Sequence, residues 1–275
     1  MKHKKSTIAL ILVLLAGLSL MLYPLVSDLW NETRQSRAIA DYTQAVAAMD
    51  DQSYRQLLRD AQAYNAELLD HPDRFYPTEE EISRYEGLLN VAGSGVMGYV
   101  EIPSIQVLLP IYHGVNEAVL QTAIGHIEGT SLPVGGESTH CVISGHRGLP
   151  SAKLFTDLDQ LDLGDTFRLR ILDEVLTYEV DQIRIVEPDD LSLLEIEPGE
   201  DLCTLVTCTP YGVNSHRLLV RGRRVVEGSA SDQIRITADA VQIDTLVVAS
   251  VVAIPILLIL SLLALLPLRH LRRRK

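Results

Sequence analysis

Cysteine is scarce in this sequence of 275 residues, which has three cysteines, at positions 141, 203 and 208. The spacings of these cysteines and of the eight histidines match no common zinc-binding pattern, so we expect neither a metal site nor another cofactor. An odd number of cysteines leaves at least one thiol without an intramolecular partner. Internal repeats and low-complexity tracts are also absent, and the length fits one folded domain.

Basic residues are rare in the central part of the chain. The two terminal flanks hold 8 of the 24 lysines and arginines and none of the 36 aspartates and glutamates. The stretch between the flanks therefore has 16 basic and 36 acidic residues. A nucleic-acid-binding surface requires the opposite balance, so nucleic acid is excluded as a partner.

Two long runs of the sequence carry no charge, Thr7 to Val26 and Thr245 to Leu268. A helix of the first length rises about 30 Å, which matches the hydrocarbon thickness of a lipid bilayer. The second run contains Pro255 and Pro267, which a spanning helix tolerates near its ends or at a kink. We therefore predict two transmembrane helices. A cleaved signal peptide is the alternative for the first run, although no clear Ala-x-Ala site follows it.

Basic residues lie on the outer side of both runs, at positions 2, 4 and 5 and at positions 269 and 272–275. The positive-inside rule then places both termini in the cytoplasm and the middle of the chain outside the membrane. The predicted order is a cytoplasmic N-terminus (1–6), a transmembrane helix (7–26), an extracytoplasmic helical segment (27–90), a main domain (91–228), a linker (229–244), a transmembrane helix (245–268) and a basic cytoplasmic tail (269–275).

The hydrophobic periodicity changes from helical to strand-like along the main part of the chain. Apolar residues recur at helical spacing from Ser36 to Leu69, and Thr78 begins a short helix toward Leu89. Two further short helices are expected at Ala118–Ile127 and Ser151–Leu161. Seven runs rich in β-branched residues predict a mainly β domain, a barrel or a sandwich: 99–102, 105–111, 140–144, 166–172, 176–186, 202–207 and 217–225.

Cys208 has the position expected of a reactive thiol. It follows the apolar run 202–207 and is followed by Pro210 and Gly212, which begin a loop where a substrate has access. Cys141 and Cys203 lie instead within strands between apolar neighbours, where cysteine usually packs as a small hydrophobic residue. If their strands are adjacent and parallel, the two are neighbours on the face away from the site, and a disulfide between them is an open alternative.

A cysteine nucleophile needs an imidazole nearby, which favours the thiolate and protonates the leaving amine. His146 lies in a glycine-flanked exit from a strand, and a structural loop histidine is the alternative for it. His216 is closer to Cys208 in sequence, but strand alternation turns it away from its neighbour Arg217. Arg217, Arg221 and Arg223 share one strand face, so a solvated basic stripe is the alternative role for Arg217.

The sequence around these residues resembles the Thr-Leu-x-Thr-Cys signature of sortases, in which an arginine follows on the next strand. The signature reads Thr204-Leu-Val-Thr-Cys208 here, and Arg217 lies at the expected spacing. The resemblance covers about residues 90–226 and extends to Met97-Gly-Tyr-Val-Glu-Ile-Pro103, Gly125-His126-Ile-Glu-Gly-Thr-Ser-Leu-Pro-Val-Gly-Gly136 and Gly145-His146-Arg147-Gly148-Leu149-Pro150. Together with the second span, this is similar to the class C, pilus-assembling sortases.

The resemblance implies an eight-stranded, extracytoplasmic sortase barrel that is anchored to the cell membrane of a Gram-positive cell. It assigns Cys208 as nucleophile, His146 as general acid and base, and Arg217 as the cation that positions the substrate or the oxyanion. The implied substrates are pilins or surface proteins with an LPxTG-like sorting signal, cleaved between Thr and Gly, and the implied acceptor is a lysine amine of a pilin. Anchoring of surface proteins to cell-wall peptidoglycan is the alternative within the family.

Class C sortases usually carry an N-terminal lid with an Asp-Pro-aromatic tripeptide, which this sequence lacks. The segment Asp70-His-Pro-Asp-Arg-Phe75 lies in the corresponding region. We expect Asp73 to approach Arg217 and Phe75 to lie on Cys208 if the segment is a lid, and neither contact if it is a plain connector.

Two other function classes remain as alternatives. A papain-like or other cysteine hydrolase would use the same cysteine and histidine but would have no need of Arg217. A metal-binding or purely structural membrane protein would use the cysteines with the histidines at positions 113, 126, 140 and 216.

Overall fold

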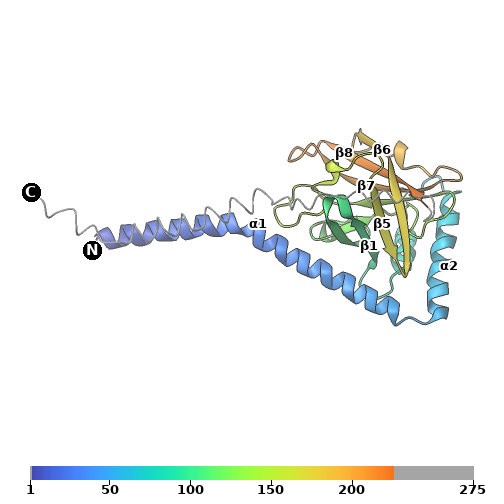
Figure 1. Ribbon diagram of the computed structural model, residues 1–275, viewed down its shortest axis with the longest axis horizontal. Coiled ribbons are helices and arrows are strands. Elements are labelled where there is room, and N and C mark those ends of the chain that lie inside the picture. The colour runs from blue at the N-terminus through green and yellow to red at the C-terminus, as the bar shows by residue number, and fades with distance from the viewer. Residues whose placement is uncertain (1, 226–275) are drawn as a thin grey trace, which may run out of the picture. The chain divides into compact units, whose positions relative to one another are not determined.

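The structure is a computed structural model that describes residues 2–225 (Figure 1). The predicted linker at 229–244, the second span at 245–268 and the basic tail at 269–275 lie outside the described residues. The chain divides into two compact units, and the unit Trp30–Asp232 contains the β-domain with the helices that pack against it.

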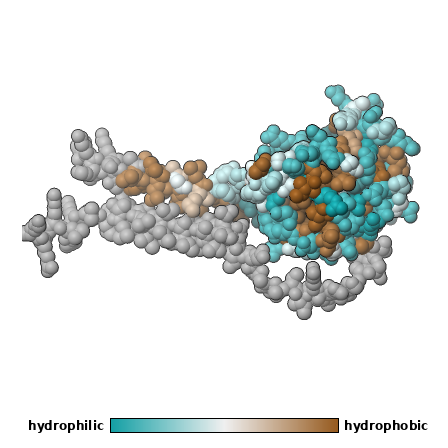
Figure 2. All heavy atoms as spheres, turned by 90° about the horizontal axis from the view of Figure 1, so that it is seen from above, coloured by the Kyte–Doolittle hydropathy of each residue, from teal (hydrophilic) through white to brown (hydrophobic). Residues whose placement is uncertain are grey.

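Helix α1, Lys2–Ala47, continues well beyond the predicted span at 7–26 and includes Pro24. It is long and apolar enough to cross a membrane, with a mean hydropathy of 2.3 over its most apolar window. Its apolar side chains, among them Leu12, Val13 and Leu20, are exposed, and Figure 2 shows this part of the helix as a hydrophobic surface. Exposed leucines in such number are expected of a helix surrounded by lipid.

The later part of α1 packs on the β-domain through polar anchors. The hydroxyl of Tyr42 donates a hydrogen bond to the Met97 carbonyl at 2.9 Å and accepts one from the Leu172 amide at 2.7 Å. Helix α2, Asp51–Leu68, begins at the N-cap Asp50 and runs alongside the barrel (Figure 1). Helix α3, Glu79–Gly87, begins with a capping box of Thr78 and Glu81.

Eight strands form a closed barrel in the order β1-β2-β3-β4-β7-β8-β6-β5, which confirms the predicted barrel architecture. The β2/β3 and β4/β7 pairs are parallel and the other pairs are antiparallel. The strands are β1 Val96–Ile102, β2 Val107–His113, β3 Ile124–His126, β4 Thr139–Ser144, β5 Thr166–Ile171, β6 Glu174–Val186, β7 Asp201–Thr209 and β8 His216–Val225.

Two of the predicted helices are wrong. In the segment 118–127, helix α4 is the single turn Glu117–Leu120, and Ile124–His126 form strand β3. Gly125 lets that strand approach its neighbour, since a Cβ there would lie 1.9 Å from the Gly114 carbonyl oxygen. In the segment 151–161 the regular helical structure is limited to the 3-10 turn η2, Leu158–Gln160. Leu154 adopts a positive φ of 41°, which an α-helix does not allow.

Two further 3-10 turns, each of three residues like η2, lie in the described chain. The turn η1, Pro103–Ile105, joins β1 to β2, so Ile105 lies outside the strand predicted for 105–111. The turn η3, Ser192–Leu194, lies in the loop between β6 and β7 and contributes Leu194 to an apolar cluster on the outside of the barrel.

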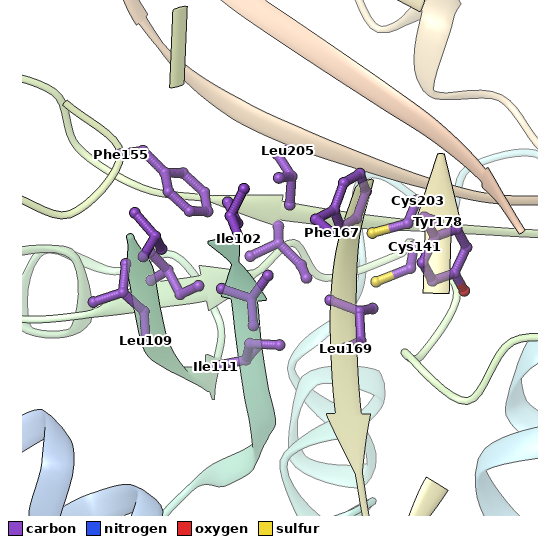
Figure 3. Packing of buried hydrophobic residues seen from close by; sticks show 14 of the residues in the cluster. Ile102, Leu109, Ile111, Cys141, Phe155, Phe167, Leu169, Tyr178, Cys203 and Leu205 are labelled. Carbon is purple, nitrogen blue, oxygen red and sulfur yellow. The ribbon is translucent and has the colours of Figure 1, made fainter. Parts of the chain in front are cut away.

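The barrel interior is filled by apolar side chains, which include the stacked rings of Phe167 and Tyr178. Cys141 of β4 and Cys203 of β7 are directly paired across the parallel strands, as expected, and their sulfur atoms lie near each other beside Tyr178 (Figure 3). Both thiols are free and buried. Burial raises the pKa of the Cys203 thiol well above its ordinary value, so this thiol is protonated and shielded from substrate.

Candidate active site

Cys208 faces outward near the end of β7. Strand alternation puts Cys203 and Leu205 inside the barrel and Val206 and Cys208 on its outer face. The strand extends to Thr209, one residue beyond Cys208, so the cysteine still has a cross-strand partner. That partner is Arg217 of β8, directly opposite in the antiparallel register. Side chains in such pairs lie on the same face, so the thiol and the guanidinium are neighbours.

His146 is held beside Cys208 by the residues that precede each of them. The Gly145 amide donates to the Val206 carbonyl at 3.0 Å, and the Thr207 hydroxyl donates to the Gly145 carbonyl at 2.7 Å. These bonds continue the parallel β4/β7 register past Ser144 and put His146 alongside Cys208. The signature threonine Thr207 therefore positions the histidine loop from inside the barrel.

Glycine is required at position 145 because its surroundings are full. A Cβ there would lie 2.7 Å from Ile124 and 2.7 Å from the Phe155 ring. The amide of Phe155 in turn donates to the His146 carbonyl at 3.2 Å. The buried Phe155 thus holds the backbone of His146 in place.

Arg217 differs from the other arginines of its strand face. Arg221 is paired with Asp181 and Glu197, and Arg223 is paired with Asp181 and Glu200. In the described part of the chain, Arg217 forms no ion pair, and its Nη1 donates only to the carbonyls of Asn214 and His216, at 3.4 and 3.2 Å. Its charge is therefore available to a substrate oxygen, whereas Arg221 and Arg223 are already paired with carboxylates.

His216 lies outside this arrangement. Its Nδ1 is 2.8 Å from the Ser215 hydroxyl and its Nε2 is 3.3 Å from a carboxylate oxygen of Glu187. It is the cross-strand partner of Thr209, so alternation turns its ring away from the face that bears Cys208.

Three further histidines have structural partners. His113 contacts the carbonyls of Gly95 and Leu88, and burial lowers its pKa. His126 contacts the Tyr85 hydroxyl at 2.8 Å and the Ser131 carbonyl at 2.8 Å. His140 contacts the Glu195 carbonyl and the Thr204 hydroxyl, each at 2.7 Å. Both nitrogens of each ring therefore have protein partners, so each of the three histidines has a structural role that needs no metal.

The segment that contains Asp73 and Phe75 is docked on the outer face of the barrel. Phe75 packs against a cluster of four buried residues, called here the outer cluster: Val142, Leu194, Val206 and Leu219. Val206 precedes Cys208 by two positions, and Leu219 follows Arg217 by two, so the ring covers the same face as the site. The expected contact of Asp73 with Arg217 is not among the ion pairs of the described residues, and Asp73 is exposed.

Arg74 anchors this segment. Its side chain is 5% exposed and donates to the carbonyls of Gly129 and Leu194, and its Nη2 lies 2.6 Å from the Glu195 carboxylate. The guanidinium also lies 4.2 Å from the centre of the Phe75 ring. Gly129 fits closely beneath, since a Cβ on it would lie 1.7 Å from the Arg74 carbonyl oxygen. Sequence reasoning considered Asp73 and Phe75 and missed the arginine between them.

Charged groups on two elements act on the His146 ring. Burial lowers the pKa of His146, and the nearby charge of Arg217 lowers it further, whereas Glu117 of α4 raises it. Glu117 was not predicted from the sequence, because the contact depends on β3. The β3/β4 register pairs Gly125 with Ser144, which carries the preceding α4 to the end of the barrel where His146 emerges.

Comparison with known proteins agrees with this geometry. Residues 100–225 match a family model described as the sortase domain. The crystal structure of sortase C1 from Streptococcus agalactiae is 53% identical, with a TM-score of 0.67, and the match covers 69% of this chain and 98% of that one. The chain belongs to the sortase family. Sortases are cysteine transpeptidases, and the similar solved structures include further sortases of class C.

One such structure is that of Clostridium perfringens sortase C with the C-terminal cell wall sorting motif, at 42% identity and a TM-score of 0.61, covering 70% of this chain and 99% of that one. Among curated relatives, sortase D of Bacillus subtilis is 32% identical over 131 residues, which are 46% of this chain and 63% of that protein. The chain thus spans less than two thirds of the length of this curated relative.

The opposing effects of Glu117 and Arg217 give a prediction for the titration of His146. In Glu117→Gln the ring loses the charge that favours its protonated form, so the pKa of His146 should fall below its already lowered wild-type value. The alkaline limb of the pH–rate profile for peptide cleavage should then move to lower pH. NMR titration of the full-length chain with labelled histidine measures the first effect, the resonance being assigned by its loss in His146→Gln.

The matched control for this titration is Glu67→Gln, which removes a carboxylate that pairs with Arg84 on α3. This variant should leave the His146 titration and the pH–rate profile unchanged. An unchanged His146 titration in Glu117→Gln would show that this carboxylate does not act on the ring.

Proposed function

We propose that this protein is a class C sortase that cleaves an LPxTG-like sorting signal between Thr and Gly and joins the Thr carbonyl to a lysine amine of a pilin, which polymerises pilus subunits. The juxtaposition on one outer face of Cys208, His146 and Arg217, which has no ion pair among residues 2–225, carries this proposal. The similarity to sortases of class C, at 42% and 53% identity in the two structures described, supports the choice of substrate class.

In the first half-reaction the Cys208 thiolate attacks the Thr carbonyl carbon. The developing oxyanion is stabilised by the Arg217 guanidinium, and such donors contribute most when they are preorganised in a site that excludes water. His146 then protonates the departing Gly amine, the C–N bond breaks, and a thioacyl enzyme remains.

In the second half-reaction the lysine amine attacks the thioester carbonyl. His146, now neutral, accepts the proton from the attacking nitrogen, the C–S bond breaks, and Cys208 leaves as the thiolate. The product is an isopeptide bond between two subunits. Exclusion of water from the site favours this transfer over hydrolysis.

The proposal is tested by incubating the full-length protein in detergent with a sorting-signal peptide, alone and with a lysine-containing pilin. Mass spectrometry should detect a thioacyl adduct on Cys208 and, with the pilin, an isopeptide product. Transfer to a peptidoglycan-type amine but not to lysine would favour the anchoring alternative. Cleavage with release to water in both reactions would indicate a hydrolase.

We further propose that the protein spans the membrane twice, at 7–26 and 245–268, with the barrel outside and both termini in the cytoplasm. The apolar α1 supports the first span, and the basic flanks support the orientation. This topology keeps the outer face of the barrel in the compartment that contains exported substrates. Protease protection of tags at both termini in sealed right-side-out vesicles tests it.

We propose that the segment 70–75 is a lid held by Phe75 and Arg74. The ring of Phe75 covers the outer cluster beside Cys208, where it competes with a substrate peptide for the same face. A lid that is closed in most molecules lowers the apparent affinity by the fraction of molecules that are open. Asp73 contributes little to closure because it is exposed and lacks an ion pair in the described residues.

Phe75→Ala should therefore raise both the alkylation rate of Cys208 and the cleavage of sorting peptide by several-fold, because it removes the aromatic cover. Cys208 is the thiol that reports, since Cys141 and Cys203 are buried. Asp73→Ala is the matched control from the same segment and should change neither rate. Equal alkylation rates in wild type and Phe75→Ala would identify the segment as a connector.

A further inference from the structure

Arg147 follows the proposed catalytic histidine, yet its side chain is only 10% exposed. Its Nη1 donates to the Thr209 hydroxyl at 3.4 Å, and its Nη2 pairs with the carboxylate of Asp159 in η2. One guanidinium therefore links the histidine loop to the end of β7 and to the segment that follows the loop. A lysine at this position has a single charged nitrogen and lacks the planar fork that reaches both partners.

Tyr211 adds a third contact from the loop between β7 and β8. Its ring centre lies 5.8 Å from the guanidinium carbon of Arg147. The same ring lies over Gly148, which has a φ of 75° and on which a Cβ would lie 3.0 Å from the ring edge. The two residues after His146 are thus covered by a residue three positions after Cys208.

These contacts complete a bracket around the proposed catalytic pair. On one side, Thr207 holds the Gly145 carbonyl, which joins the residues that precede Cys208 and His146. On the other side, Arg147 holds Thr209, which joins the residues that follow them. Both bonds lie between β7 and the exit of β4, one before and one after the proposed catalytic pair.

We propose that Arg147 is a positioning residue that sets the separation between the His146 imidazole and the Cys208 sulfur, an inference that rests on the proposed roles of those two residues. The guanidinium Nε is buried without a protein partner among the described residues. An unpaired buried donor is unfavourable, so stability alone does not account for an arginine here. Proton transfer between His146 and the reacting groups depends on their distance, which makes the reaction sensitive to this residue.

Arg147→Lys tests the proposal in the full-length protein in detergent, with a sorting-signal peptide as substrate. We expect kcat for cleavage to fall by about tenfold or more, because misplacement of a reacting group by about 1 Å costs up to about 10²-fold. The KM for the peptide should change little. NMR titration should show the pKa of His146 moving from its lowered value toward that of a solvated histidine, as the ring leaves the influence of burial and of Arg217 and Glu117.

Tyr211→Ala is the second variant, because Tyr211 is 61% exposed and its removal leaves the barrel folded. It should change kcat and the His146 titration in the same direction as Arg147→Lys, by a smaller factor. The control is Arg84→Lys, which alters an ion pair with Glu67 between α2 and α3, away from the site. It should leave both quantities unchanged.

Normal kcat in Arg147→Lys would overturn the proposal, and so would a loss of activity that follows the fraction unfolded while the His146 titration is unchanged. Peptide cleavage is the readout, so the result does not depend on the acceptor. If wild type cleaves the peptide without transfer to lysine, the proposed polymerase activity fails while the role of Arg147 is still measured.

Discussion

Cys208→Ala is expected to abolish peptide cleavage and amine transfer, with kcat/KM reduced by at least about 10³-fold, as loss of a covalent nucleophile does in other enzymes. The substitution removes the sulfur that must form the thioacyl bond, and the other two cysteines are buried in the barrel. The fold should persist because Cys208 faces outward and belongs to neither apolar cluster. Mass spectrometry of the acyl enzyme, peptide cleavage and thermal unfolding of the full-length chain measure the three effects.

The matched controls are Cys141→Ala and Cys203→Ala, which remove thiols from the barrel interior. Each should retain turnover and lose on the order of 1 kcal/mol of unfolding free energy through the cavity left behind. Polymer formation by Cys208→Ala near the wild-type rate would refute the assignment of the nucleophile. Loss of turnover in a stably folded Cys141→Ala protein would place the reaction elsewhere.

The barrel could be predicted because the local sequence pattern indicates most of its strands. The seven runs of β-branched residues each correspond to an observed strand, with ends shifted by a few residues. Strand β3, only Ile124–His126, was missed because three residues are too few to show a period of two. Its existence depends on the close approach of Gly125 to the Gly114 carbonyl, a tertiary contact that no local pattern contains.

The pairing of Cys208 with Arg217 could also be predicted from local sequence. Cys208 and Arg217 are 9 positions apart on consecutive antiparallel strands, so the spacing in the sequence and the observed register both make them neighbours. The position of His146 depends on the parallel β4/β7 pairing, which the sequence analysis gave only as a condition and which local spacing does not show. The surrounding residues Glu117 and Arg147 were missed because their contacts come from the short β3 and from the irregular chain around η2. These segments lack a regular period, so only the assembled barrel shows what their side chains touch.

Arg217→Lys is the second variant for which we expect a large loss, about 10²-fold in kcat/KM, similar to the removal of one oxyanion donor in other acyl transferases. Lysine keeps the charge opposite Cys208 but loses the planar fork that can hold two oxygens at once. Arg217 uses Nη1 alone for the carbonyls of Asn214 and His216, which leaves Nη2 and Nε to face the substrate, whereas a lysine has one nitrogen for both tasks.

The control on the same strand face is Arg223→Lys, which alters a surface pair with Glu200 and should cost little activity, since exposed ion pairs contribute about 1 kcal/mol or less to stability. Steady-state cleavage and the yield of acyl enzyme at a single turnover separate a defect in attack from a defect in release. If Arg217→Lys forms the acyl enzyme at the wild-type rate, the arginine does not stabilise the first oxyanion. The other arginines of this face are paired with carboxylates, so in that case backbone amides at the end of β7 would have to stabilise the oxyanion. The role of Arg217 would then be to bind the peptide alone.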